Sequence, residues 1–115
     1  MYRLLLILFV GLFASCKQDS FHVPNGILKP DSLAAIQADF YIVEAAYNLT
    51  FVKPDSLLPQ YEDYYKAVME QHHTQKSQID SSIKFYAKHP EEYKKVYAKS
   101  LELLEVKKIK AASKK

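Results

Sequence analysis

Apolar and polar side chains alternate with helical spacing along four stretches of the chain. In the first, from about Ser32 to Leu49, apolar positions recur every three or four residues, as on one face of an α-helix. Alanine and aliphatic side chains fill a second side of this stretch, which is typical of a helix at the centre of a bundle or covered by a partner. The later stretches span about Leu57 to His72, Gln75 to Lys88 and Pro90 to residue 106. The pattern predicts an all-α fold, a small bundle of about four helices.

Residues that favour helix starts precede these stretches. Asp31 or Ser32 can accept a hydrogen bond from a free N–H of the first helix, and Thr74 can do the same for the third. Pro90 suits the first turn of the fourth helix, where the missing N–H is not needed. Residues 29–41 and 53–65 share seven of 13 positions, beginning with Lys-Pro-Asp-Ser-Leu in both. Either a duplicated helix or convergence on one helix start explains this repeat.

A different pattern occupies the first 16 residues. Arg3 supplies a positive charge, and Leu4–Phe13 follows as an almost wholly apolar run. Small residues, Ala14 and Ser15, then come just before Cys16. This order is that of a secretory signal peptide. Ten residues rise only ~15 Å as a helix, about half of a bilayer core, so the run is too short to span a membrane.

The end of this segment, Phe13-Ala14-Ser15-Cys16, resembles the lipobox of bacterial lipoproteins, with Phe13 where leucine is usual. In such proteins the cysteine thiol receives a diacylglyceryl group and the signal is removed before it. The resemblance therefore implies a signal peptide of residues 1–15 and lipid attachment at Cys16. Cys16 is the only cysteine, so the chain can form no internal disulfide. An ordinary secreted protein with a chance cysteine is the alternative.

Charge and polarity divide the remainder into three parts. Residues 16–29 are polar, lack periodicity and include the turn signal Pro24-Asn25-Gly26, which predicts a flexible tether before a helical domain of residues 30–106. Residues 107–115 form a basic C-terminal tail with five lysines, whereas the rest of the chain after Cys16 has ten lysines and 13 acidic residues. This balance argues against a nucleic-acid-binding domain. The tail either contacts anionic lipid or an acidic partner, or is a frayed, solvated helix end.

Several runs in the helical part are similar to those of a known family. They are Ala38–Ala46, Ile79–Tyr86 and His89-Pro90-Glu91. Together with Cys16 and with Pro30 at the first helix, they resemble an uncharacterised family of short Bacteroidota lipoproteins, domain of unknown function 4296. The resemblance covers about Lys29 to Leu104. It implies a lipid-anchored helical protein of the cell envelope and no particular activity.

Asp39 is the acidic residue that the pattern singles out. It lies away from the polar strip of the first helix, among apolar positions, so a carboxylate there needs partners. Tyrosine hydroxyls from other helices can supply them, and Tyr64 and Tyr97 are the candidates. Asp39, Tyr64 and Tyr97 are therefore the predicted members of either a structural hydrogen-bond hub or a ligand site.

No catalytic, metal-binding or cofactor-binding pattern stands out. His72 and His73 would point ~100° apart on a helix, and Glu70 with His73 supplies only two ligands, so both histidines are interpreted as solvated residues at a helix end. The sequence lacks a serine-nucleophile motif, and two glycines are too few for a phosphate-binding loop. Ser32 and Ser56 each lie in Asp-Ser-Leu, which resembles an O-glycosylation motif of Bacteroidota envelope proteins as well as a helix start.

The sequence thus predicts a lipid-anchored envelope protein that is not an enzyme, has no cofactor or metal and binds no nucleic acid. The first hypothesis is an accessory module that binds another envelope protein, on the outer membrane of a Gram-negative bacterium. The alternative is a small-ligand carrier with a Tyr-lined pocket between helices near Asp39. Tyrosine suits either a core or an interface, because its ring is apolar and its hydroxyl is polar.

Overall fold

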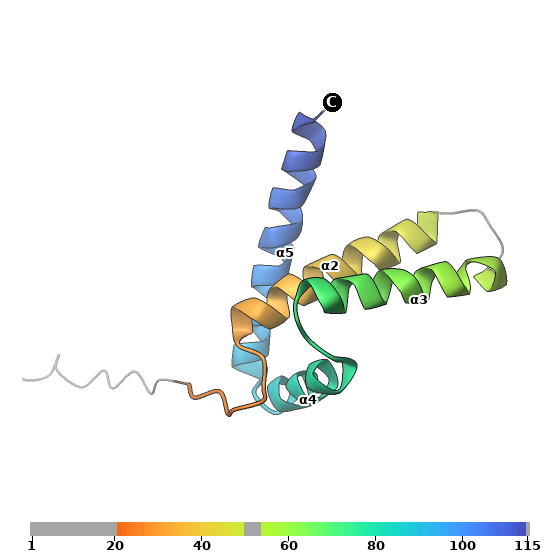
Figure 1. Cartoon of the computed structure of the whole chain (residues 1–115). Helices are drawn as coiled ribbons and strands as arrows, with labels where there is room; N and C mark the ends of the chain where they lie inside the picture. The colour runs from red at the N-terminus through yellow and green to blue at the C-terminus, as the bar shows by residue number, and fades with distance from the viewer. Residues whose placement is uncertain (1–20, 50–53, 115) are drawn as a thin grey trace, which may run out of the picture.

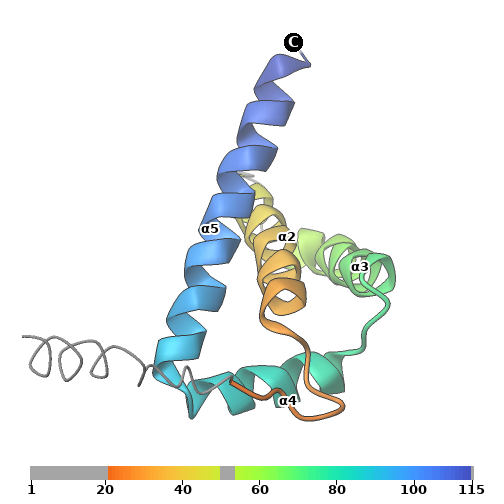
Figure 2. The same cartoon turned by 90° about the vertical axis from the view of Figure 1, so that its left-hand side faces the viewer.

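Four α-helices build the part of the chain that the structure, a computed structural model, describes: residues 21–49 and 54–114 (Figure 1). The helices are α2 (Pro30–Leu49), α3 (Pro54–Gln71), α4 (Lys76–Ala87) and α5 (Pro90–Ser113). No strand occurs within these residues, so the predicted all-α class and the number of helices are confirmed. α2 lies between α5 and α3, with its largest contact on α5, and α4 crosses near the start of α5 (Figure 2).

Prolines mark three of the four helix starts. α2, α3 and α5 each begin at a proline, whose missing N–H is not needed in a first turn. α5 begins where the sequence predicts, but α2 and α3 begin two and three residues earlier. Asp31 therefore lies inside the first turn of α2, near the positive end of the helix dipole. Thr74 does not cap α4, because Gln75 holds that position and the Thr74 hydroxyl donates to the side chain of Gln78 instead.

The core surrounds the N-terminal half of α2. Six of the seven residues from 33 to 39 are buried, which agrees with the two apolar sides of this helix in the sequence. Two clusters of buried side chains join the helices; they consist of Leu33, Ala34, Tyr86 and Val96, and of Ile36, Val68 and Ile79. The later turns of α2 are more exposed, and Ile42 retains 43% of its surface.

Two hydrogen bonds fix the segment before α2 to α4. The N–H of Leu28 donates to the Ser82 hydroxyl oxygen at 2.9 Å, and the Tyr86 hydroxyl donates to the carbonyl of Leu28 at 2.9 Å. Ser82 and Tyr86 are fully buried, so the N–H and the carbonyl of Leu28 both have hydrogen-bond partners in the interior. Burial raises the pKa of Tyr86, and the charge of Glu92 adds to the effect, which keeps this hydroxyl a donor.

This attachment changes the extent of the predicted tether. The sequence assigns residues 16–29 to it, but Phe21, Ile27 and Leu28 pack against the core. These apolar side chains hold the segment in place although it lacks helical periodicity. The predicted turn at residues 24–26 is present, and Gly26 has a φ of 85°, which glycine adopts without strain.

The predicted signal peptide, residues 1–15, and Cys16 lie outside the described residues. Among the residues that are described, no helix is both long and apolar enough to cross a membrane. α5 continues to Ser113, so residues 107–113 of the predicted basic tail are helical.

Candidate functional site

The carboxylate of Asp39 joins three helices. Asp39 lies on α2 and is only 9% exposed. The Nε2 atom of His72, just after the end of α3, donates to Oδ2 at 2.7 Å, and the ammonium of Lys107 on α5 donates to Oδ1. Burial alone would raise the pKa of Asp39, but the hydrogen bonds and charges of Lys107 and His72 outweigh it and hold this pKa below its usual value. Asp39 is therefore the centre of a charged cluster, Asp39–His72–Lys107.

The tyrosines predicted beside Asp39 lie elsewhere. Tyr64 is 53% exposed on α3 and Tyr97 is half exposed on α5, and neither is among the hydrogen-bond partners of Asp39. A ring nitrogen of His72 and the ammonium of Lys107 take their place, because a hydrogen bond from a charged donor such as lysine compensates a buried carboxylate better than one from a neutral hydroxyl.

Sequence reasoning missed both partners. The sequence pattern predicts a solvated His72, whereas only 19% of this side chain is exposed, and it assigns Lys107 to the tail. One signal was present: Lys107 continues the three- and four-residue spacing of Val96, Ser100 and Leu103, which face the core. A lysine on that face, together with an acid among the apolar positions of the first helix, would have indicated the pair.

The end of α3 positions His72. The N–H of His73 donates to the carbonyl of Glu70 at 3.1 Å, and the N–H of Thr74 donates to that of Met69 at 3.0 Å. This pair of bonds is a Schellman motif, which ends the helix sharply. His73 occupies its left-handed position with a φ of 51°, where glycine is usual and a side chain is strained.

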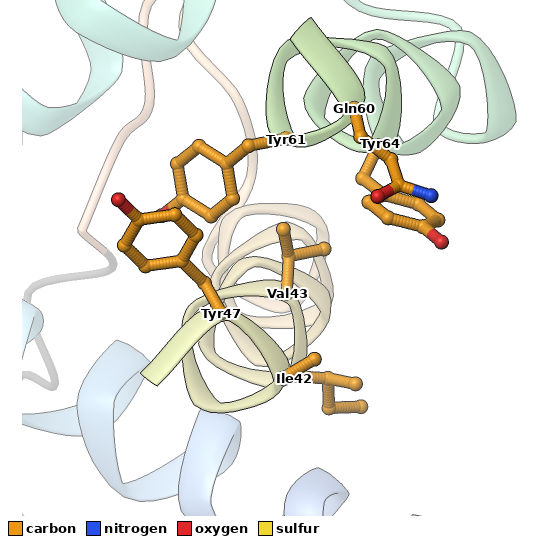
Figure 3. A pocket seen from close by; sticks show the side chains of 7 residues that line it. Ile42, Val43, Tyr47, Gln60, Tyr61 and Tyr64 are labelled. Atoms are coloured by element: carbon orange, nitrogen blue, oxygen red, sulfur yellow. The ribbon is translucent and has the colours of Figure 1, made fainter. Parts of the chain in front are cut away.

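A groove opens between the later turns of α2 and the middle of α3 (Figure 3). We refer to it as the α2–α3 groove; its volume is about 480 Å³, and it is lined by Ile42, Val43, Ala46, Tyr47, Gln60, Tyr61 and Tyr64. Val43 points between the helices, with Tyr47 and Tyr61 on one side and Gln60 and Tyr64 on the other. The groove begins about one turn after Asp39 on α2, because Val43 follows it by four residues.

Tyrosines hold one side of the groove together. The ring of Tyr61 lies 4.7 Å from those of Tyr47 and Tyr65, measured between centroids. The Tyr65 hydroxyl donates to the Glu44 carboxylate at 3.0 Å, so it accepts at 2.9 Å from the hydroxyl of Tyr61. Burial, followed by these hydrogen bonds, raises the pKa of Tyr65. The chain of hydroxyls links α3 to α2 beside the opening.

The charged cluster around Asp39 and the α2–α3 groove differ in chemistry. In the described residues, no group of three His, Cys, Asp or Glu side chains is placed to hold a metal ion. Each oxygen of Asp39 already accepts a hydrogen bond, so this carboxylate stabilises the junction of three helices. The α2–α3 groove has apolar and aromatic walls and few polar groups, which suits an apolar side chain or a small apolar molecule.

Fold and groove together define a small helical-bundle domain with an apolar groove on its surface. The family model described as "Domain of unknown function (DUF4296)" matches residues 24–110, and the chain belongs to this family. Searches among curated proteins and among solved structures found no match. Family membership therefore supplies a domain type and no biochemical activity.

Proposed function

We propose that this protein is a lipid-anchored, non-enzymatic protein of the cell envelope whose helical domain binds another envelope protein. The α2–α3 groove carries the proposal. It leaves Ile42 and Tyr64 about half exposed on a small domain, and tyrosine is enriched at protein interfaces. An amphipathic segment that places an apolar side chain over Val43 would cover both residues.

The position of the groove supports an anchor at the other end of the domain. Phe21, the first described residue, contacts Phe85 and His89 where α4 meets α5. The groove-lining part of α2 begins 12 residues after Pro30, which is ~18 Å along the helix. A lipid on Cys16 would then hold the base of the domain near the membrane, taken as the outer membrane, and leave the groove accessible.

The proposal is tested by a photo-reactive residue at position 64 of the full chain in intact cells, with the same residue at Ser77 on the exposed side of α4 as the matched control. We expect one defined protein to cross-link from position 64 and not from position 77. A Cys16→Ser chain should leave the membrane fraction and lose this product, because two or more acyl chains are needed for stable attachment. Equal products from both positions would contradict a specific interface.

A small-ligand carrier is the second candidate, favoured by the size of the groove, which falls in the range of ligand sites. A bound fatty acid should then raise the melting temperature of the full chain in proportion to the logarithm of its concentration. Tyr64→Ala should reduce that rise. A melting temperature that does not respond to saturating fatty acid argues against this function.

A further inference from the structure

The C-terminal turns of α5 carry exposed apolar side chains with no cover. Lys107 is the last residue of α5 with a hydrogen bond to another described helix, yet the helix continues to Ser113. Val106 is 42% exposed and Ile109 is 65% exposed. They are three residues apart and so share a face. We refer to residues 106–114 as the α5 end.

The α5 end is strongly basic and its charges are largely uncompensated. Residues 107–115 contain five lysines and no acidic residue. Among the described residues, no ion pair involves Lys108, Lys110 or Lys114. Lys110 follows Val106 by four residues and adjoins Ile109, so a positive charge accompanies the apolar face.

The α3 side of the α2–α3 groove is acidic, opposite in charge to the α5 end. α3 contains four acidic residues and one lysine. Asp63 on α3 is exposed and forms no ion pair within the described part of the chain. It follows the groove residue Gln60 by three positions, so the two side chains are neighbours on the helix surface. An occupant of this groove should therefore combine apolar side chains with positive charge, which is the composition of the α5 end.

The two surfaces cannot meet within one molecule. Both views show the C-terminal turns of α5 standing apart from α3, and in Figure 1 α5 runs steeply across the direction of the α2–α3 hairpin. α5 is fixed in this direction by its packing along α2 and by the Lys107–Asp39 pair. The groove of one molecule is accessible only to the α5 end of another.

We propose that the partner bound in the α2–α3 groove is the α5 end of a second copy of this chain, with Ile109 and Val106 against Val43 and Tyr64 and with Lys110 facing Asp63. The proposal rests on the proposed binding function of the groove and names its occupant. Each copy offers one groove and one α5 end, so the contact closes as a reciprocal pair or continues along a row of molecules. Anchoring in one membrane would raise the effective concentration of the copies.

Cysteine pairing in intact cells tests this contact directly, because Cys16 is the only cysteine of the chain. One tagged full-length copy carries Tyr64→Cys and a differently tagged copy carries Ile109→Cys; both positions are exposed, so the fold tolerates the changes. After mild oxidation, we expect a disulfide between the two tags at least about tenfold above that of a matched pair, Ser77→Cys with Ile109→Cys. Val106 still docks the α5 end when Ile109 is replaced, and burial of one aliphatic side chain is worth about that factor. Equal yields from the two pairs would overturn the proposal.

A charge exchange distinguishes this contact from random collision. Lys110→Glu in the copy with Ile109→Cys should lower the disulfide yield about two- to fivefold, as expected for one ion pair at the rim of an interface. Asp63→Lys in the other copy should restore it. A disulfide yield that neither substitution changes contradicts the placement of Lys110 opposite Asp63.

The photo-cross-linking experiment at position 64 distinguishes the binding function of the groove from the identity of its occupant. A product between two copies of the chain supports both. A product with a different protein, together with no excess disulfide, leaves the binding function standing and overturns the α5 end as the occupant. The absence of any product contradicts both.

Discussion

Asp39 is a buried acid whose two oxygens accept hydrogen bonds from Lys107 on α5 and from His72 just after α3. In Asp39→Asn the charge that compensates Lys107 is lost and His72 loses a charged acceptor, so we expect the free energy of unfolding to fall by about 1–2 kcal/mol. Asp80→Asn is the matched control, because Asp80 pairs with Lys76 on the surface of α4. Its effect should stay below about 0.5 kcal/mol in urea unfolding. Equal losses in the free energy of unfolding would show that the buried Asp39 stabilises the fold no more than a surface aspartate does.

The lowered pKa of Asp39 makes part of the stability depend on pH. An aspartate in an unfolded chain has a pKa of about 3.9, and the folded value lies below it. The folded state therefore binds fewer protons near that pH, so the contribution is complete above about pH 5 and is lost as the pH falls through the folded pKa. We expect the stability difference between wild type and Asp39→Asn, measured by urea unfolding, to shrink in acid. A difference that is constant from pH 7 to pH 3 contradicts this.

His73 holds a strained conformation next to a residue of the charged cluster. Glycine adopts a φ of 51° without a steric penalty, so His73→Gly should raise the free energy of unfolding by roughly 0.5–1 kcal/mol. Ala67→Gly, at an exposed position inside α3, should instead lower it by about as much, because glycine weakens a helix interior. Thermal unfolding of the two variants gives the comparison. Destabilisation by both would mean that the His73 side chain makes a contribution of its own.

At the scale of the elements, Ser82 is where α4 holds the segment before α2. Its hydroxyl accepts from the N–H of Leu28 and donates to the carbonyl of Gln78. Ser82→Ala leaves a buried N–H without an acceptor and should cost about 1–3 kcal/mol. The adjacent, exposed Ser81→Ala should change stability by less than about 0.5 kcal/mol. Faster amide hydrogen exchange at Leu28 in the first variant alone would locate the effect.

Sequence periodicity predicted the elements better than their contacts. α5 starts at Pro90 as expected, and the two apolar sides of α2 indicated its central place, because local patterns report local structure. The starts of α2 and α3 were placed late because Pro-Asp-Ser was interpreted as a cap and not as a first turn. Asp39 was singled out correctly as an acid among apolar positions. Its partners were not found because they lie 33 and 68 residues away in the chain.

At the scale of the whole molecule, Lys107 separates the part of α5 that stabilises the fold from the part that is free. Deletion of residues 108–115 should change the free energy of unfolding by less than about 0.5 kcal/mol, since the described side chains of this segment, residues 108–114, are exposed. Deletion of residues 107–115 also removes the lysine on Asp39 and should lower it by about 1–2 kcal/mol more. Denaturant unfolding of the two chains measures this one-residue difference. Indistinguishable stabilities would place the boundary elsewhere.

The largest helix contact joins α2 to α5, with two other helices between them in the sequence. A ribosome that adds 5–20 residues per second needs about 3 to 13 s to pass from Pro30 to Val96, the buried residue that covers the start of α2. Throughout this interval the side of the most apolar helix, α2, that faces α5 has no cover, although α3 and α4 are being completed. The nascent chain is thus open to chaperones for most of its synthesis, and its core closes only once α5 has emerged.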